Sequence, residues 1–243
     1  MRTQLNLKFS IGFSLVEMSV VLIILGFVIG ALLMPVQAQR QQQAQLQTEN
    51  FLEISKKSLM GYAQSQGRLP CPATVSGVEA VTAGVCDKAV GFLPAATLGM
   101  QPTNAQGFAV DGWGNPIRYA VTLSNANAFV TAGGMANVSI STLDPDIRVC
   151  AMSTGITASR CSVSATETNY FINNAVAVIY STGATGTQVA GGADETANLN
   201  DDSVFVSHEP RSASDANGEF DHIMTWISPF VLYNAMIEAG QLH

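Results

Sequence analysis

The first long feature of the chain is an almost unbroken run of apolar residues from residue 13 to residue 34. It contains a single charged residue, Glu17. A helix of this length would rise about 33 Å, which is enough to cross the roughly 30 Å hydrocarbon core of a bilayer. The pattern therefore predicts a transmembrane helix over residues 13–34.

The helical pattern continues into a more polar segment. Small and apolar residues recur at steps of three and four between residues 44 and 63, as expected for one face of a helix. Pro35 predicts a kink near the start of this segment, and Gly67 and Pro70 supply a stop signal. We expect residues 35–66 to form an amphipathic continuation of the helix, whose apolar face needs a partner surface.

The remaining residues, 67–243, predict one globular head of mixed helix and strand, an α+β fold. Gly, Pro and small polar residues indicate loops up to about Pro116. A C-terminal helix is expected over residues 221–239, with a break at Pro229. Strands are predicted at 117–123, 128–131, 147–152, 175–181 and 203–207.

Composition and charge narrow the possible functions. Hydrophobic residues make up 47% of the chain, which is enough for a core, but charged residues make up only 12%, about half the usual share. The net charge is −7, and phosphate neutralisation requires clustered Lys and Arg. We therefore expect no direct binding to nucleic acid.

Four cysteines, Cys71, Cys86, Cys150 and Cys161, form no CxxC pair, so zinc and thioredoxin-type chemistry are disfavoured. Two separated pairs suggest two disulfides in an oxidising compartment. Of the three possible connectivities we favour the local one, Cys71–Cys86 and Cys150–Cys161. The alternative is four buried free thiols.

Three interpretations of the N-terminus compete. An ordinary signal peptide is supported by the small residues after Pro35, but its apolar core would be shorter than this one. An uncleaved membrane anchor explains the length, but not Glu17. A carboxylate at the centre of a membrane helix costs about 2.5–3.5 kcal/mol on insertion scales.

The third interpretation rests on the sequence Gly12-Phe13-Ser14-Leu15-Val16-Glu17. It resembles the processing site of type IV prepilins and type II secretion pseudopilins. The resemblance implies a leader over residues 1–12, cleavage after Gly12 and methylation of the new N-terminal Phe13. Glu17 would become the fifth residue, and its carboxylate would pair with the Phe13 amine of a neighbouring subunit during assembly.

The same resemblance implies the architecture, the partners and the location. A long pilin-like helix would pack on an antiparallel β-sheet head, and residues 13–34 would form the filament core. The partners would be a prepilin peptidase and N-methylase, other pilin or pseudopilin subunits, and the inner membrane before assembly. The protein would be a single-pass bacterial inner-membrane protein with a periplasmic head, and later part of an extracellular pilus or a periplasmic filament.

Two segments of the head also resemble pseudopilins: residues 111–116, DGWGNP, and residues 180–184, YSTGA. Some pseudopilins bind calcium in the acidic loop that follows the second segment. The corresponding candidate ligands are Asp194, Glu195, Asp201 and Asp202. A solvated acidic loop is the alternative, and we expect no other metal or cofactor.

The chain carries no sequence motif of a known catalytic centre, and its three histidines, His208, His222 and His243, fall in none. We therefore do not expect an enzyme. The favoured function is a structural subunit, a pilin or minor pilin, of a type IV pilus serving adhesion, motility or DNA uptake. The alternatives are a pseudopilin of a type II secretion system and a membrane-tethered periplasmic binding module that does not polymerise.

Overall fold

The computed structural model describes residues 14–163, 169–186 and 191–242, except for the side chains of residues 31–36. The leader, residues 1–12, and Phe13 lie outside the described residues. The chain divides into two compact units, Met1–Gln43 and Ala44–His243.

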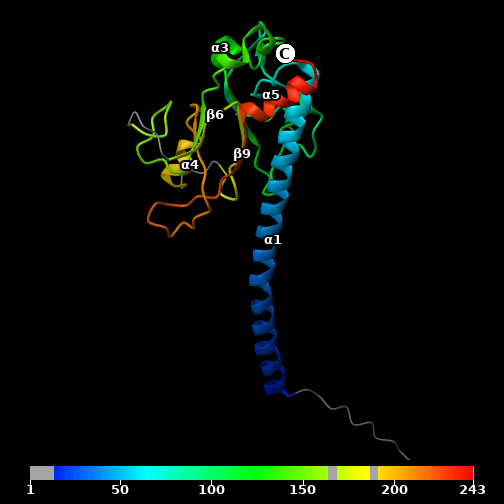
Figure 1. The fold of residues 1–243 in the computed structure, drawn as a ribbon. Coiled ribbons are helices and arrows are strands. Elements are labelled where there is room, and N and C mark those ends of the chain that lie inside the picture. The colour runs from blue at the N-terminus through cyan, green and yellow to red at the C-terminus, as the bar shows by residue number, and fades with distance from the viewer. Residues whose placement is uncertain (1–13, 164–168, 187–190, 243) are drawn as a thin grey trace, which may run out of the picture. The chain divides into compact units, whose positions relative to one another are not determined.

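One long helix, α1 (Leu15–Gln66), begins in the first unit and ends in the second (Figure 1). This confirms the predicted N-terminal helix, which is assigned without interruption through Pro35. The helix ends where Gly67 adopts a left-handed conformation at φ +68° and donates its N–H to the carbonyl of Ala63. Glycine is favoured there because it has no Cβ to clash in that conformation.

The described residues contradict the prediction that the protein spans the inner membrane. Among them, no helical stretch combines the length and the apolar character that crossing a bilayer requires. This contradicts a single-pass inner-membrane protein with a periplasmic head.

The described residues of the second unit form three sheets. The largest has the strand order β3-β4-β7-β9 and is antiparallel throughout. A three-stranded sheet has the order β6-β5-β8, in which β5 pairs antiparallel with β6 and parallel with β8. The strands are β1 (Val81–Thr82), β2 (Val85–Cys86), β3 (Val90–Phe92), β4 (Arg118–Val121), β5 (Ile147–Cys150), β6 (Tyr170–Ala175), β7 (Ala177–Ser181), β8 (Val204–Val206) and β9 (Ile223–Ile227).

Short helices connect these strands. They are α2 (Ala95–Leu98), α3 (Ser124–Asn127), η1 (Met135–Asn137), η2 (Ile140–Thr142), α4 (Ala193–Ala197) and α5 (Pro229–Glu238). α5 lies against the last turns of α1, where the Gln64 amide donates to the Ala235 carbonyl (Figure 1). The mixed α and β architecture with antiparallel pairing is therefore as expected, and the parallel β5–β8 pair was not anticipated.

The central sheet is covered on both faces. Tyr119 and Ile179 share a buried cluster with Leu52 and Leu59 of α1. Because successive side chains alternate across a strand, neighbouring residues such as Val178 face the other way, into a cluster shared with the three-stranded sheet. Within the second unit, the last part of α1, the central sheet and the smaller sheet thus form three layers.

The predicted strands at 117–123, 147–152, 175–181 and 203–207 coincide with β4, β5, β7 and β8. The strand predicted at 128–131 is wrong. Those residues form turns in which Val130 donates to the carbonyl of Asn127 rather than to a neighbouring strand.

The predicted helix over residues 221–239 is wrong in its first half. Residues Ile223–Ile227 form β9, which pairs with β7, and only Pro229–Glu238 are helical. Pro229 therefore starts the helix instead of interrupting it, which is possible because the first helical residue needs no N–H partner.

The structure pairs Cys71 with Cys86 and Cys150 with Cys161. The local connectivity is therefore confirmed, and free thiols are excluded. Each bridge closes a short loop that has little regular structure of its own. Such bridges are typical of proteins in oxidising compartments.

Candidate functional site

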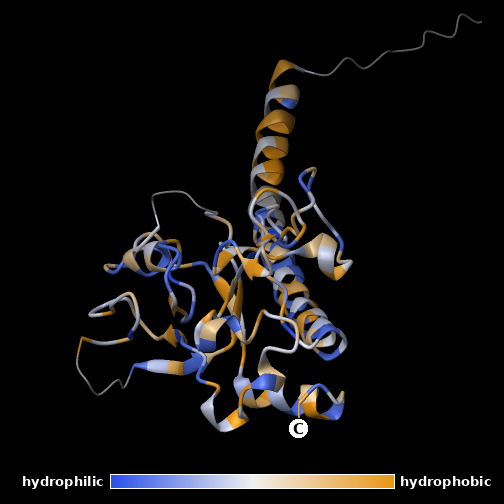
Figure 2. Ribbon diagram, turned by 90° about the horizontal axis from the view of Figure 1, so that it is seen from above, coloured by the Kyte–Doolittle hydropathy of each residue, from blue (hydrophilic) through white to orange (hydrophobic). Residues whose placement is uncertain are grey.

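The first unit presents a helix with an unburied apolar surface. Twelve large apolar residues between Leu15 and Ile29 are 47–88% exposed. In Figure 2 the ribbon of this first part of α1 is coloured mostly as hydrophobic. A contiguous exposed apolar surface of this kind marks an interaction site in soluble proteins.

The start of this helix is closed by a reciprocal pair of hydrogen bonds. The backbone N–H of Ser14 donates to Oε2 of Glu17 at 3.0 Å, and the N–H of Glu17 donates to Oγ of Ser14 at 3.2 Å. This is a capping box, in which residues three apart satisfy two N–H groups that have no partner inside the helix. The Ser-x-x-Glu spacing could have revealed this role from the sequence. Gly12 and Phe13 lie outside the described residues, so their roles in processing and in pairing with Glu17 stay predictions.

The four calcium candidates make separate contacts in the second unit. Asp201 accepts from Arg118 at 3.0 Å and lies 3.9 Å from the Lys88 ammonium. Asp202 accepts the Asn200 amide at 2.7 Å and the Val204 N–H at 2.8 Å. The other two candidates, Asp194 and Glu195, lie on α4 and each hold a different part of the chain.

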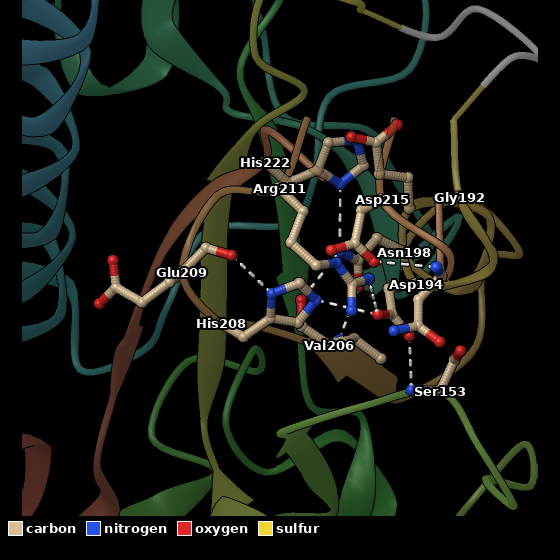
Figure 3. A network of polar contacts seen from close by, with 12 residues as sticks. Ser153, Gly192, Asp194, Asn198, Val206, His208, Glu209, Arg211, Asp215 and His222 are labelled. Atoms are coloured by element: carbon tan, nitrogen blue, oxygen red, sulfur yellow. Dashed lines mark hydrogen bonds and ion pairs between the residues drawn. The ribbon is translucent and has the colours of Figure 1, made fainter. Parts of the chain in front are cut away.

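Asp194 is the centre of a polar network that joins α4 to the segment after β8 (Figure 3). Its carboxylate accepts the Ser153 N–H at 2.7 Å, Nε2 of His208 at 2.9 Å, and the Arg211 guanidinium. Burial alone would raise the pKa of Asp194, but the hydrogen bonds from Ser153, Arg211 and His208 outweigh it and lower the pKa to about 2. Since its oxygens already accept from these donors, Asp194 is poorly suited to bind a metal ion.

His208 lies between two hydrogen-bond acceptors. Its Nδ1 lies 2.7 Å from the Glu209 carbonyl, and its Nε2 lies 2.9 Å from the Asp194 carboxylate. A neutral ring donates to one of them, and a protonated ring donates to both. Arg211 is the permanently positive partner of Asp194 in this network.

Glu195 holds the far end of the same segment. Its Oε1 accepts the Asp221 N–H at 2.7 Å. The Asp221 carboxylate in turn accepts the N–H and the hydroxyl of Thr185, at 2.8 and 3.0 Å. Burial raises the pKa of Glu195, and the charges of Asp221 and Glu219 raise it further, to about 7. Asp194 and Glu195 thus bind the two ends of the segment between β8 and β9. Asp194 contacts His208 and Arg211 near its start, and Glu195 contacts Asp221 at its end.

Potential ligand atoms of Glu195, Asp221 and His222 lie within 4.8 Å of one another. The tautomer of His222 argues against a metal centre. Asn198 bonds both the N–H and the carbonyl of Val206, which fixes its amide, and its remaining hydrogen points at Nδ1 of His222. Nδ1 must therefore accept and Nε2 carry the proton, so the imidazole has no lone pair left for a metal.

Without His222 the cluster offers two carboxylates, whereas calcium takes six to eight oxygen ligands. The described residues therefore do not fit a calcium ion at this cluster. Burial and the neighbouring Asp221 carboxylate disfavour a negative charge on Glu195, and both raise its pKa.

We expect Glu195→Gln to change how stability depends on pH. The pKa of Glu195 is raised by folding, so its contribution is complete below pH ~4.5 and is lost as the pH rises through about 7. The amide cannot ionise, and its oxygen can still accept the Asp221 N–H. Relative to wild type, the variant should therefore gain up to about 2 kcal/mol between pH ~4.5 and 8, after allowance for solvent screening. Urea unfolding of both proteins across this range measures the difference.

His222 contributes an opposite slope. Burial lowers the pKa of His222 to about 4, so its contribution is present above pH ~6.5 and is lost as the pH falls through about 4. In Glu195→Gln, where residue 195 no longer titrates, the free energy of unfolding should therefore rise with pH as His222 loses its proton. Glu209→Gln, which changes a surface carboxylate, is the matched control. Its free energy of unfolding should change with pH in parallel with that of wild type. If the Glu195→Gln curve also runs parallel to wild type, folding does not raise the pKa of Glu195.

The two segments of the head that resemble pseudopilins meet in space. The Ser181 hydroxyl donates to Oδ2 of Asp111 at 2.5 Å, and the Asn115 amide donates to the Gly183 carbonyl at 2.7 Å. The adjacent Gly112 N–H donates to the Thr48 hydroxyl of α1 at 3.0 Å. This junction therefore ties the turn after residue 110, the end of β7 and the last part of α1 together.

The chain matches no family model, and no curated protein or solved structure matches it. The resemblance to pilins therefore rests only on the sequence motifs described above.

Proposed function

We propose that the protein is a structural subunit, a pilin or minor pilin, of a type IV pilus-like filament. It is processed after Gly12 and assembles through its N-terminal helix. The observation that carries this proposal is the exposed apolar start of α1, headed by a single carboxylate at Glu17.

The exposed apolar start of α1 requires a partner surface. A helix that is apolar on all sides is stable in water only when other surfaces cover it. Copies of the same helix supply a matching apolar surface, and residues 26 and 30 are glycines at a spacing that allows close helix contact. A carboxylate inside such a bundle needs a positive partner, and the amine of Phe13 in the next subunit is the partner that the processing motif implies.

The test is intact-mass and N-terminal peptide analysis of the protein from its native source. A chain that starts at N-methylated Phe13 is the expected result. A chain that starts at Gln39 would identify an ordinary secreted protein, and an intact Met1–Gly12 would mean that the peptidase does not act on it. Either result would overturn the proposal.

A second candidate is a pseudopilin of a type II secretion system. The contact between residues 111–116 and the end of β7 favours it, because these are the two head segments that resemble pseudopilins. Deletion of the gene separates the two candidates. Loss of pili with normal protein secretion supports the pilin, and failed secretion with normal pili supports the pseudopilin.

A further inference from the structure

A polar cavity lies beside the Asp194 network, between the segment after β5, the start of α4 and the loop after β8. Its volume is about 440 Å³, within the range of about 300–1,000 Å³ typical of small-molecule sites. Met152, Thr154, Asp194, Arg211 and Asn217 are among the residues that line it. All of them belong to the second unit.

The cavity is richer in available donors than in available acceptors. The Asp194 carboxylate already accepts from Ser153, His208 and Arg211. Arg211 uses Nη2 for that contact, and its Nη1 has no hydrogen-bond partner among the described residues. The Thr154 hydroxyl and the Asn217 side-chain amide also lack partners in the described part of the chain.

Arg211 is the positive side chain that lines the cavity, and its free Nη1 can donate to a carboxylate of a ligand. Asp194 is paired with Arg211, and His208 adds a second positive charge only when it is protonated. Asp215, which accepts the Asn217 N–H at 2.9 Å, places a carboxylate on the loop that borders the cavity. It would repel a second negative charge, so a carboxylate suits this site better than a phosphate dianion. A guanidinium is well matched to a carboxylate in geometry.

The other lining groups suit a polyhydroxylated ligand. Thr154 and Asn217 can each donate and accept, as sugar hydroxyls require. The Met152 side chain, which is 42% exposed, offers an adaptable apolar contact for C–H groups. We propose that this cavity binds a hydroxyl-rich monocarboxylate, the chemistry of an acidic sugar. This gives the head a ligand-binding role that is separate from filament assembly.

The experiment is calorimetric titration of the full-length protein with sodium D-glucuronate and, in parallel, with neutral D-glucuronamide. The two probes differ only in the carboxylate. We expect glucuronate to bind and the amide to bind at least tenfold more weakly, because a hydrogen bond to a charged group is worth about 1.5–3 kcal/mol. Equal affinity for the two probes, or no heat with glucuronate at millimolar concentration, overturns the proposal.

Variants locate the binding site. Thr154→Val and Asn217→Ala remove groups that have no side-chain partner, so the fold should persist while the affinity for glucuronate falls several-fold. Arg211→Gln should abolish the preference for glucuronate over the amide, with circular dichroism confirming that the variant is folded. Arg40→Gln removes a positive charge from an exposed position of α1 and should change nothing. A loss with Arg40→Gln equal to that with Asn217→Ala would indicate unspecific attraction and exclude the cavity as the site.

Discussion

Glu17→Gln is expected to abolish filament assembly while removal of the leader continues. The amide is close to the carboxylate in size, and glutamine can replace glutamate in a capping box. The variant therefore keeps the hydrogen bond to the Ser14 N–H and loses only the charge. Among packed apolar helices the effective dielectric constant is low, so an unneutralised Phe13 amine would weigh heavily against insertion of a subunit. Electron microscopy of sheared filaments, with the mature mass as the readout for processing, measures both effects.

Ser14→Ala is the matched control. It removes the hydroxyl that accepts the Glu17 N–H and keeps the charge. Loss of such a cap costs about 1 kcal/mol of helix stability, so this variant should still assemble. If Ser14→Ala fails and Glu17→Gln succeeds, the carboxylate acts as a helix cap only. If both assemble normally, or no filament exists in the wild type, a binding module that does not polymerise becomes the better description.

The sequence predicted elements whose signals are local. The three- and four-residue periodicity along α1 was sufficient for its second half, because Gly67 ends the helix by its own conformational preference. The disulfides followed from spacing, since each pair closes a short loop. The strand β4 followed from alternation directly after a dense turn.

The predictions from sequence were wrong where contacts between residues far apart in the chain decide the structure. Residues 223–227 contain apolar side chains that suit either a helix face or a strand, and only their pairing with β7 selects the strand. The same limit applies to the polar network. Asp194 is 14 residues before His208 and 41 after Ser153 in the chain, and no spacing rule connects residues so far apart. The sequence identified the acidic loop but not the cations that hold it.

Asp194→Ala is expected to be the most destabilising change in this network. Its carboxylate is almost fully buried and accepts from Arg211 and His208. Removing it leaves the Arg211 guanidinium without its counter-charge, the His208 ring without its partner and the Ser153 N–H without an acceptor. Breaking a buried ion pair by removing one partner costs about 3–5 kcal/mol, and we expect about 3 kcal/mol because Arg211 and His208 remain partly in contact with water. Urea unfolding at pH 7 with both disulfides intact measures this loss.

The pH dependence of that loss identifies its cause. Folding lowers the pKa of Asp194 to about 2, so its contribution is complete above pH ~3.9 and is lost as the pH falls through about 2. The difference between wild type and Asp194→Ala should therefore narrow below pH ~4. Asp202→Ala, which removes only local contacts of its own turn, should cost far less at every pH. A double-mutant cycle with Arg211→Gln then separates the ion pair from the backbone contact, because residues in one network do not contribute additively. A coupling energy near zero would mean that Asp194 stabilises the fold through the Ser153 N–H rather than through charge.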